Sequence, residues 1–297
     1  MSDYHTSVLL QETIEQLQIK NGSRYIDGTL GGGGHTFAVL DLGGTVLGLD
    51  VDQDALDYVE EKLKTQNANV KIGENLFLAK GNFKDIDILA KENGFTKVSG
   101  ILLDLGISSH HVDAAERGFS FLKTAPLDMR MDKTLQVTAG DLVNALTKNE
   151  LIDLLINLGE EPFAKAIASH IVEARKTKRI ETTTELAEII KKSVPYSKKG
   201  ISPATKAFQA LRIAVNDELN ILIETLPKAF SLLESGGRLA VISFHSLEDR
   251  IVKRSFMEFE AKGMGTVITK KPIVPTEEEI AHNSRSRSSK LRVFEKI

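Results

Sequence analysis

The chain has 297 residues, of which 41% are hydrophobic and 27% charged, and its formal net charge at pH 7 is -3. This length and composition allow one large core or two smaller ones. The chain contains no cysteine, which excludes disulfides, iron–sulfur clusters and a cysteine nucleophile, and we expect no metal site.

The first residues of the chain show no basic segment followed by an apolar run, which is the pattern of an export signal. No later segment reaches the roughly 18 apolar residues that a membrane span needs. We therefore expect a cytoplasmic protein without membrane contact.

Short apolar segments then alternate with helical patterns along the first hundred residues. RYID at 24–27, TVLGLD at 45–50 and VSGILLD at 98–104 are predicted strands, and FLAK at 77–80 is a weaker strand between the second and third of these. Because Val/Ile/Leu strands alternate with helices, the pattern predicts an α/β fold whose parallel sheet is covered on both faces.

A glycine-rich turn follows the first predicted strand in the segment DGTLGGGGH, residues 27–35. Glycines at this position let the backbone approach a nucleotide ligand closely. A dinucleotide fingerprint needs a third Gly or Ala, but counting from Gly31 gives Thr36 and counting from Gly32 gives Phe37. A P-loop is excluded because no Gly-Lys-Ser/Thr follows. A nicotinamide-dependent oxidoreductase is therefore disfavoured.

An acidic residue ends the second predicted strand. Asp50 lies about twenty residues beyond the glycines, where a carboxylate would bind the ribose hydroxyls of an adenosine. Asp52 and Asp54 are the near alternatives, and Asp50 could instead only cap a helix. Phe83 follows the weaker predicted strand at 77–80, and its ring would lie near the adenine or belong to the core.

A long insertion interrupts the strand pattern. More than a hundred residues separate Asp104 from the next strand, RLAVIS at 238–243, whereas a simple crossover needs about a few dozen. Residues 136–211 read as helices, so we predict α/β parts at 1–135 and 212–297 around a helical domain at 136–211. Segments 265–268 and 291–296 are predicted edge strands.

Several polar residues at strand ends and in loops are candidates for chemistry. Asp104 ends the central strand, where it would either act on a substrate or cap the following turn. His245 and Ser246 follow the fifth strand at its carboxyl end, where ligands bind in such sheets. In PLDMRMD, Arg130 would bind a phosphate or pair internally with Asp128.

Basic runs are candidates for phosphate contact, with ordinary solvated faces as the alternative. They comprise Arg175–Arg179, Lys191, Lys192, Lys198, Lys199, Arg285, Arg287, Lys290 and Arg292.

Several sequence blocks, taken in order, resemble one family closely. The blocks are YHTSVLLQE, YIDGTLGGGGH, GILLDLGISS, ERGFSF, PLDMRMD, TKAFQALRIAVNDEL, GGRLAVISFHSLEDRIVK and SRSRSSKLRV. From about Tyr4 to Val293 the chain resembles the bacterial S-adenosylmethionine (SAM)-dependent methyltransferases that modify a cytosine N4 in small-subunit ribosomal RNA.

The resemblance implies a class I, Rossmann-like methyltransferase domain with an inserted helical domain. It implies S-adenosyl-L-methionine as cofactor and 16S rRNA within the small ribosomal subunit as partner. It also implies cofactor contacts from Gly33, Gly34, His35, Asp50, Phe83, Asp104 and His111. Family members usually carry Pro-Gln or His-Gln after GISS, whereas this chain has His110-His111.

The expected chemistry places a demand on the acceptor site. The exocyclic amine of cytosine is a poor nucleophile, so the site should supply hydrogen-bond acceptors that hold its N–H groups. Asp104 is the predicted catalytic residue, and Asp128, Arg130, His245 and Ser246 are predicted to contact the substrate. A SAM enzyme with another substrate and a non-catalytic RNA-binding assembly factor remain the alternatives.

Overall fold

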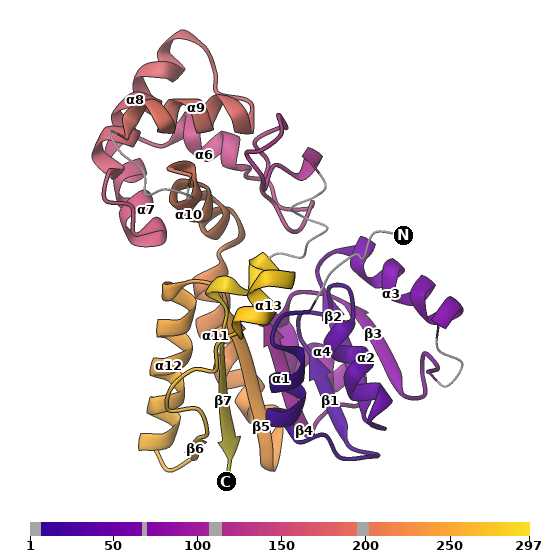
Figure 1. The fold of residues 1–297 in the computed structure, drawn as a ribbon. Helices are drawn as coiled ribbons and strands as arrows, with labels where there is room; N and C mark the ends of the chain where they lie inside the picture. Colours follow the sequence, from indigo (N-terminus) through magenta and orange to yellow (C-terminus); the bar gives the residue numbers. More distant parts are fainter. Residues whose placement is uncertain (1–6, 67–69, 107–114, 195–201) are drawn as a thin grey trace. The chain divides into compact units, whose positions relative to one another are not determined.

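The computed structural model describes residues 7–66, 70–106, 115–194 and 202–297, which form two compact units. The first unit comprises Met1–Ser108 and Leu219–Ile297, and the second comprises Ser109–Glu218 (Figure 1). None of the helices in these described segments has the length and apolar character that crossing a bilayer would need.

A seven-stranded sheet forms the centre of the first unit, in the order β3-β2-β1-β4-β5-β7-β6. The pairs that include β7 are antiparallel and the others are parallel. The predicted α/β class with a mostly parallel sheet is confirmed. The strands are β1 (Arg24–Asp27), β2 (Thr45–Asp50), β3 (Leu76–Lys80), β4 (Val98–Asp104), β5 (Leu233–Ser243), β6 (Gly265–Val267) and β7 (Lys290–Lys296).

The prediction that the last strand is an edge strand is wrong. β7 lies inside the sheet, with β5 on one side and β6 on the other. An isolated bridge between Ile273 and Leu291 extends this cover beyond the short β6. Leu291, Val293 and Phe294 are fully buried, and such an apolar strand is protected from aggregation when both of its edges are paired.

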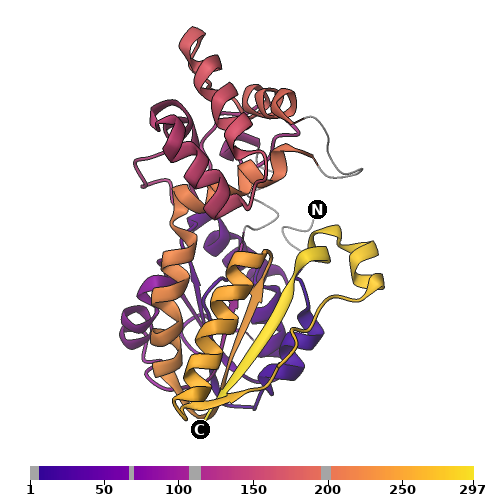
Figure 2. The ribbon, with the colours of Figure 1, turned by 90° about the vertical axis from the view of Figure 1, so that its left-hand side faces the viewer.

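Helices cover both faces of this sheet (Figures 1 and 2). Successive strand residues point to opposite faces, so Tyr25 and Ile26 of β1 belong to two different core clusters. Side chains of α4, α11 and α12 share the cluster of Ile26, and those of α2 and α3 share the cluster of Tyr25. The helices of this unit are α1 (Leu10–Leu17), α2 (Gly34–Asp41), α3 (Gln53–Gln66), α4 (Ile86–Glu92), α11 (Glu218–Leu232), α12 (Ser246–Ala261) and α13 (Glu277–His282), with short 3-10 turns η1 (Phe83–Asp85) and η3 (Ser284–Ser288).

The strand order reverses direction between β1 and β4. From β1 the chain proceeds outward to β2 and β3, and from β4 it proceeds to the other side through β5. Ligands bind doubly wound sheets at this reversal, outside the carboxyl ends of the strands. Asp27 and Asp104 are the last residues of these two strands.

The second unit is helical within its described residues. Its elements are η2 (Ala115–Arg117), α6 (Ala139–Ala145), α7 (Lys148–Gly159), α8 (Ala164–Thr177), α9 (Thr183–Ser193) and α10 (Ala204–Asn216). Thr138, Thr147 and Thr182 each begin a helix with a capping box, in which an acidic residue three positions later completes the reciprocal bonds. These caps fix where α6, α7 and α9 start.

This unit includes more residues than the predicted insert at 136–211, because the preceding loop is hydrogen-bonded to its helices. The backbone N–H of Leu127 donates to the carbonyl of Glu181 at 3.0 Å, and that of Thr183 donates to the carbonyl of Ala125 at 2.9 Å. The PLDMRMD loop is thus part of the helical unit, together with α9.

Candidate active site

The turn after β1 takes a shape that only glycine accommodates. Gly31 and Gly33 have left-handed φ angles of 48° and 72°. A Cβ on Gly33 would lie 2.9 Å from side chains of α2 and α3, and one on Gly34 would lie 2.0 Å from the Oγ of Ser7. The N-cap of α2 has no side-chain hydrogen bond. The first amide groups of α2 are therefore presented by bare backbone, as a nucleotide site requires.

Asp50 ties the end of β2 to this glycine turn. Its Oδ2 accepts a hydrogen bond from the N–H of Gly31 at 2.9 Å, and its Oδ1 accepts one from the N–H of Asp52 at 2.9 Å. A carboxylate is an acceptor-only group with about four lone-pair sites, which suits it to bind ribose hydroxyls. The alternative Asp52 is buried and accepts from the N–H of Asp54 at 3.2 Å. The geometry favours Asp50 among the three candidates.

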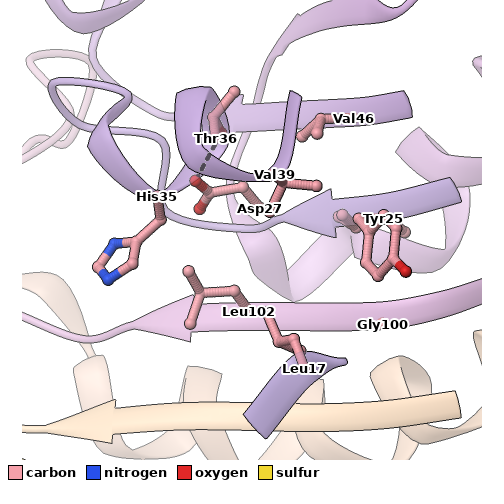
Figure 3. Close-up of a pocket in the computed structure, with 10 residues that line it drawn as sticks. Leu17, Tyr25, Asp27, His35, Thr36, Val39, Val46, Gly100 and Leu102 are labelled. Carbon is pink, nitrogen blue, oxygen red and sulfur yellow. Dashed lines mark hydrogen bonds between the residues drawn. The ribbon is translucent and has the colours of Figure 1, made fainter. Parts of the chain in front are cut away.

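A buried carboxylate lies directly under the turn, beside a small cavity (Figure 3). The Oδ2 of Asp27 accepts a hydrogen bond from the hydroxyl of Thr36 at 2.7 Å, and its Oδ1 accepts one from the N–H of Thr29 at 3.2 Å. Burial, opposed by these hydrogen bonds and reinforced by the charge of Asp50, raises the pKa of Asp27 to about 6. The side chain of Asp27 therefore holds the turn through its hydrogen bonds to Thr29 and Thr36, although burial disfavours the ionised form of this carboxyl group.

Asp104 closes the site from β4. Its backbone N–H donates to the Oγ1 of Thr29 at 2.6 Å, which couples the end of β4 to the glycine turn. Its Oδ2 lies 3.8 Å from the Nδ1 of His35. Its Oδ1 is buried and has no hydrogen-bond partner among the described residues. Burial, followed by the charges of Asp27 and Glu248, raises the pKa of Asp104 well above its usual range.

His35 is a buried residue in the first turn of α2, directly after the glycine turn. Its Nε2 lies 3.1 Å from the carbonyl oxygen of Val8, and a carbonyl only accepts, so we assign the proton to Nε2. Nδ1 then faces Asp104. The ring links the residues before α1 to the end of β4, and its predicted contact with the cofactor stays a prediction.

Phe83 begins η1 after β3, at the same edge of the sheet. Its ring is half-buried against the core cluster that includes α4 and α11, and its carbonyl accepts a hydrogen bond from Thr225 at 3.3 Å. Core packing is thus observed, and contact with an adenine stays a prediction. His111 lies outside the described residues.

His245 is engaged at the start of α12. As N-cap, its Nδ1 accepts a hydrogen bond from the N–H of Glu248 at 3.4 Å. In return, the Oε2 of Glu248 accepts hydrogen bonds from the N–H groups of Phe244 at 2.8 Å and His245 at 3.2 Å. Ser246 is exposed at the first position of the helix. The predicted substrate contacts of His245 and Ser246 stay predictions.

Glu248, together with Thr29 and Thr36, was not among the predicted site residues. The sequence signal for Glu248 is the capping-box spacing of His245-Ser-Leu-Glu248 directly after a buried strand. That spacing predicts the cap but does not predict proximity to the end of β4.

Asp128 and Arg130 belong to the second unit and bind each other. The Nε and Nη2 of Arg130 donate to the two carboxylate oxygens of Asp128 at 2.7 and 2.8 Å, and Nη1 donates to the carbonyl of Leu135 at 2.6 Å. Burial acts to raise the pKa of Asp128, but the hydrogen bonds and charge of Arg130 outweigh it and leave the pKa lowered. The internal ion pair, one of the two predicted alternatives, is present.

The loop that carries this pair is held from both sides. The side chain of Asn216 accepts from the N–H of Met131 at 2.7 Å and donates to the carbonyl of Met129 at 2.8 Å. The guanidinium of the buried Arg117 donates to the carbonyl of Met131 at 2.8 Å. Met129 has a left-handed φ of 64°, a conformation that needs such surrounding support in a non-glycine residue.

Two of the predicted phosphate-binding arginines serve internal roles. Arg175 donates to the carbonyls of Val143 and Leu146 at 2.6 Å, at the end of α6. Arg292 is buried and donates to Asp249 at 2.6 Å. Both interactions satisfy groups within the fold. Lys198 and Lys199 lie outside the described residues.

Comparisons with known proteins agree over the full length. The sequence profile described as the MraW methylase family matches residues 2–297. A protein of Acetivibrio thermocellus named ribosomal RNA small subunit methyltransferase H is 47% identical, over 100% of both chains. A protein of the same name from Lachnospira eligens is 45% identical, over 99% of this chain and 98% of its own.

A third protein of that name, from Clostridioides difficile, is 43% identical over 100% of both chains. Among solved structures, a putative rRNA methylase from Clostridium thermocellum matches 98% of each chain with 15% identity and a TM-score of 0.47.

Proposed function

Because the chain belongs to the MraW methylase family, we propose that it transfers a methyl group from SAM to the exocyclic N4 amine of a cytidine in small-subunit ribosomal RNA. The predicted family is confirmed by the full-length match. The relatives are named as methyltransferases of small-subunit ribosomal RNA, and this name supports the RNA substrate.

One arrangement carries the proposal: the glycine turn, the Asp50 carboxylate bonded to it, and the buried Asp104 at the adjoining strand end. The turn has no room for side chains at Gly33 and Gly34. Asp50 holds the turn by accepting from the N–H of Gly31, and a carboxylate is the kind of acceptor that ribose hydroxyls bind. Asp104 offers a carboxylate oxygen without a partner among the described residues. These groups fit an adenosine with a reacting group at the reversal of strand order.

SAM, when bound, supplies an electrophilic methyl group on a positively charged sulfur. Gly33 and Gly34 would hold the cofactor through backbone, and Asp50 would hold its ribose. The described residues also include two buried carboxyl groups, Asp27 and Asp104, whose pKa values are raised by burial. A bound cation would favour their ionised forms and would be attracted by them in this low-dielectric position. This combination of backbone groups and carboxyl groups therefore suits an adenosine that carries a sulfonium.

The acceptor amine needs a hydrogen-bond acceptor and a destination for its proton. Its lone pair is delocalised into the ring, so an acceptor that holds an N–H group increases the electron density on nitrogen. Asp104 Oδ1 is suited to this role because it is buried and unpartnered within the described residues. We assign Asp104 as the catalytic residue, with its carboxylate directed at the base amine.

The substrate proposed in full is 16S rRNA within the small ribosomal subunit, in the cytoplasm where that particle is assembled. Enzymes that modify a base inside a folded RNA take it out of the stack or from a single strand. The exposed Arg285 and Arg287 of η3 are candidates for phosphate contact on the first unit.

The direct test supplies purified protein with isotopically labelled SAM and small subunits from cells that lack the enzyme, then analyses rRNA digests by mass spectrometry. We expect label in N4-methylcytidine, and no label with the matched variant Asp104→Asn. A free rRNA arm run in parallel identifies the preferred substrate. Label in protein, or on a ring carbon of the base, would contradict the proposal.

A further inference from the structure

We propose that Glu248 is a positioning residue for methyl transfer, because its buried negative charge beside the end of β4 makes Asp104 a better proton acceptor for the base amine. This inference rests on the proposed function of the site. It adds a residue from α12 to a site otherwise formed by β1, β2, β4 and the glycine turn.

The position of Glu248 follows from the pairing of β4 with β5. Asp104 is opposite Ile242 in the parallel register, and the N–H of Leu105 donates to the carbonyl of Ile242 at 2.9 Å. Glu248 folds back from α12 to accept from the N–H of Phe244, two residues beyond Ile242. The carboxylate is therefore fixed at the strand end that adjoins Asp104.

Backbone hydrogen bonds to Glu248 favour its charged form. Its Oε2 accepts from two N–H groups, those of Phe244 and His245, and hydrogen bonds to a carboxylate favour its charge. Its Oε1 lies 3.2 Å from the Nε2 of His245. The side chain is only 3% exposed, so water screens this charge weakly.

Asp104 is faced by charged or titratable groups from three elements. Asp27 lies at the end of β1, His35 on α2 and Glu248 on α12. The two carboxylates oppose ionisation of Asp104, whereas His35 would favour it only when protonated. Burial is the largest cause of the raised pKa of Asp104, followed by Asp27 and then Glu248. Glu248 is therefore a separable contributor.

The proton step is simple to balance. The amine nitrogen would form a bond to the methyl carbon as the bond from that carbon to sulfur breaks, and the electron pair of the broken bond would stay on sulfur and neutralise it. One N–H bond of the amine breaks, its electron pair stays on nitrogen, and an O–H bond forms at Asp104 Oδ1. The product leaves as neutral methylated base, and the proton later passes to water. A carboxylate with higher proton affinity drives this step further, provided that it is ionised when the base binds.

The first experiment measures protonation directly and needs neither cofactor nor turnover. The full chain, labelled with 13C at aspartate carboxyl carbons, is titrated by NMR, and Asp104 is assigned by the signal lost in Asp104→Asn. Glu248→Gln removes the charge but keeps an amide oxygen that can complete the capping box. Glu258→Gln is the matched control, since Glu258 is exposed on the same helix and pairs with Lys262.

We expect Glu248→Gln to lower the Asp104 midpoint, because one like charge is removed, and Glu258→Gln to leave it unchanged. An unchanged midpoint in Glu248→Gln would overturn the inference. A wild-type Asp104 midpoint near the ordinary value of about 4 would also overturn it, and this measurement needs no variant of Glu248.

The second experiment follows single-turnover methylation against pH. With Glu248→Gln, the acid limb of the profile should move to lower pH and the plateau should fall, because Asp104 ionises earlier but is a weaker base. A purely structural role would lower the whole profile without moving the limb, and that result would refute the proposal. Product analysis at one pH tests the methylated atom separately, so failure of the proposed function is distinguishable.

Discussion

Replacing Asp27 with asparagine tests the buried acid network under the glycine turn. Asp27 is 4% exposed and its pKa is raised from 3.8 to about 6. Asparagine keeps the shape of the side chain, can accept from Thr29 and can donate to the Thr36 hydroxyl. It carries no charge at any pH, so it removes the titration of Asp27 and also the charge that opposes ionisation of Asp104.

The sign and size of the effect follow from the raised pKa. An acid that binds its proton more tightly in the folded state stabilises that state most below its unfolded pKa. This contribution is lost as the pH rises through the folded value. A pKa that rises from 3.8 to about 6 on folding corresponds to about 3 kcal/mol in total, of which roughly 1.4 kcal/mol is lost between about pH 5 and 8.

The assay is urea unfolding of wild type and Asp27→Asn at several pH values across that window. The free energy of unfolding of wild type, relative to the variant, should fall by roughly 1.4 kcal/mol from about pH 5 to 8. Asp41→Asn is the control, because Asp41 is exposed at the end of α2, the helix that carries Thr36. Parallel pH profiles for wild type and Asp27→Asn would refute the assignment of a buried, raised-pKa carboxyl at this position.

Three further substitutions test the turn and the second unit. Asp50→Ala should weaken SAM binding by about 1–3 kcal/mol, measured by calorimetry; unchanged affinity would mean that the ribose is held elsewhere. Gly33→Ala should cost at least about 1–2 kcal/mol for the left-handed backbone, and should lower the melting temperature more than Gly31→Ala, whose added Cβ would make only an ordinary contact with the carbonyl oxygen of Thr29 at 3.9 Å. Equal losses would contradict the crowding at Gly33. Asn216→Ala should destabilise the chain by about 1–3 kcal/mol for each partner left unpaired in the buried loop; an unchanged urea midpoint would show that this loop does not depend on Asn216.

Strand positions and the cofactor turn could be predicted from the sequence because they depend on local patterns. Runs such as RYID and TVLGLD are apolar, bounded by glycine or charge, and too short for helices, and they coincide with β1 and β2. The separation of the glycines from Asp50 is likewise set by one strand-helix-strand unit. In the structure, this separation brings the carboxylate of Asp50 to the N–H of Gly31, where the two form a hydrogen bond.

The tertiary structure alone decided which distant groups meet. Glu248 is far from Asp104 in the sequence, and only the pairing of β4 with β5 brings α12 to the end of β4. The same holds for Asn216, whose amide closes a loop 85 residues earlier at Met131. Long-range contacts of this kind leave no periodic signal, because each depends on how whole elements pack.

Packing also determined which partner each charged side chain binds. The sequence left Arg130 open between phosphate binding and an internal pair, and the fold places its guanidinium on Asp128. The last strand was predicted to be an edge strand, yet β6 pairs with its outer side. Local sequence determined what each segment is, whereas burial and strand pairing determined its partners, since desolvation and hydrogen-bond geometry depend on neighbours that the local pattern does not specify.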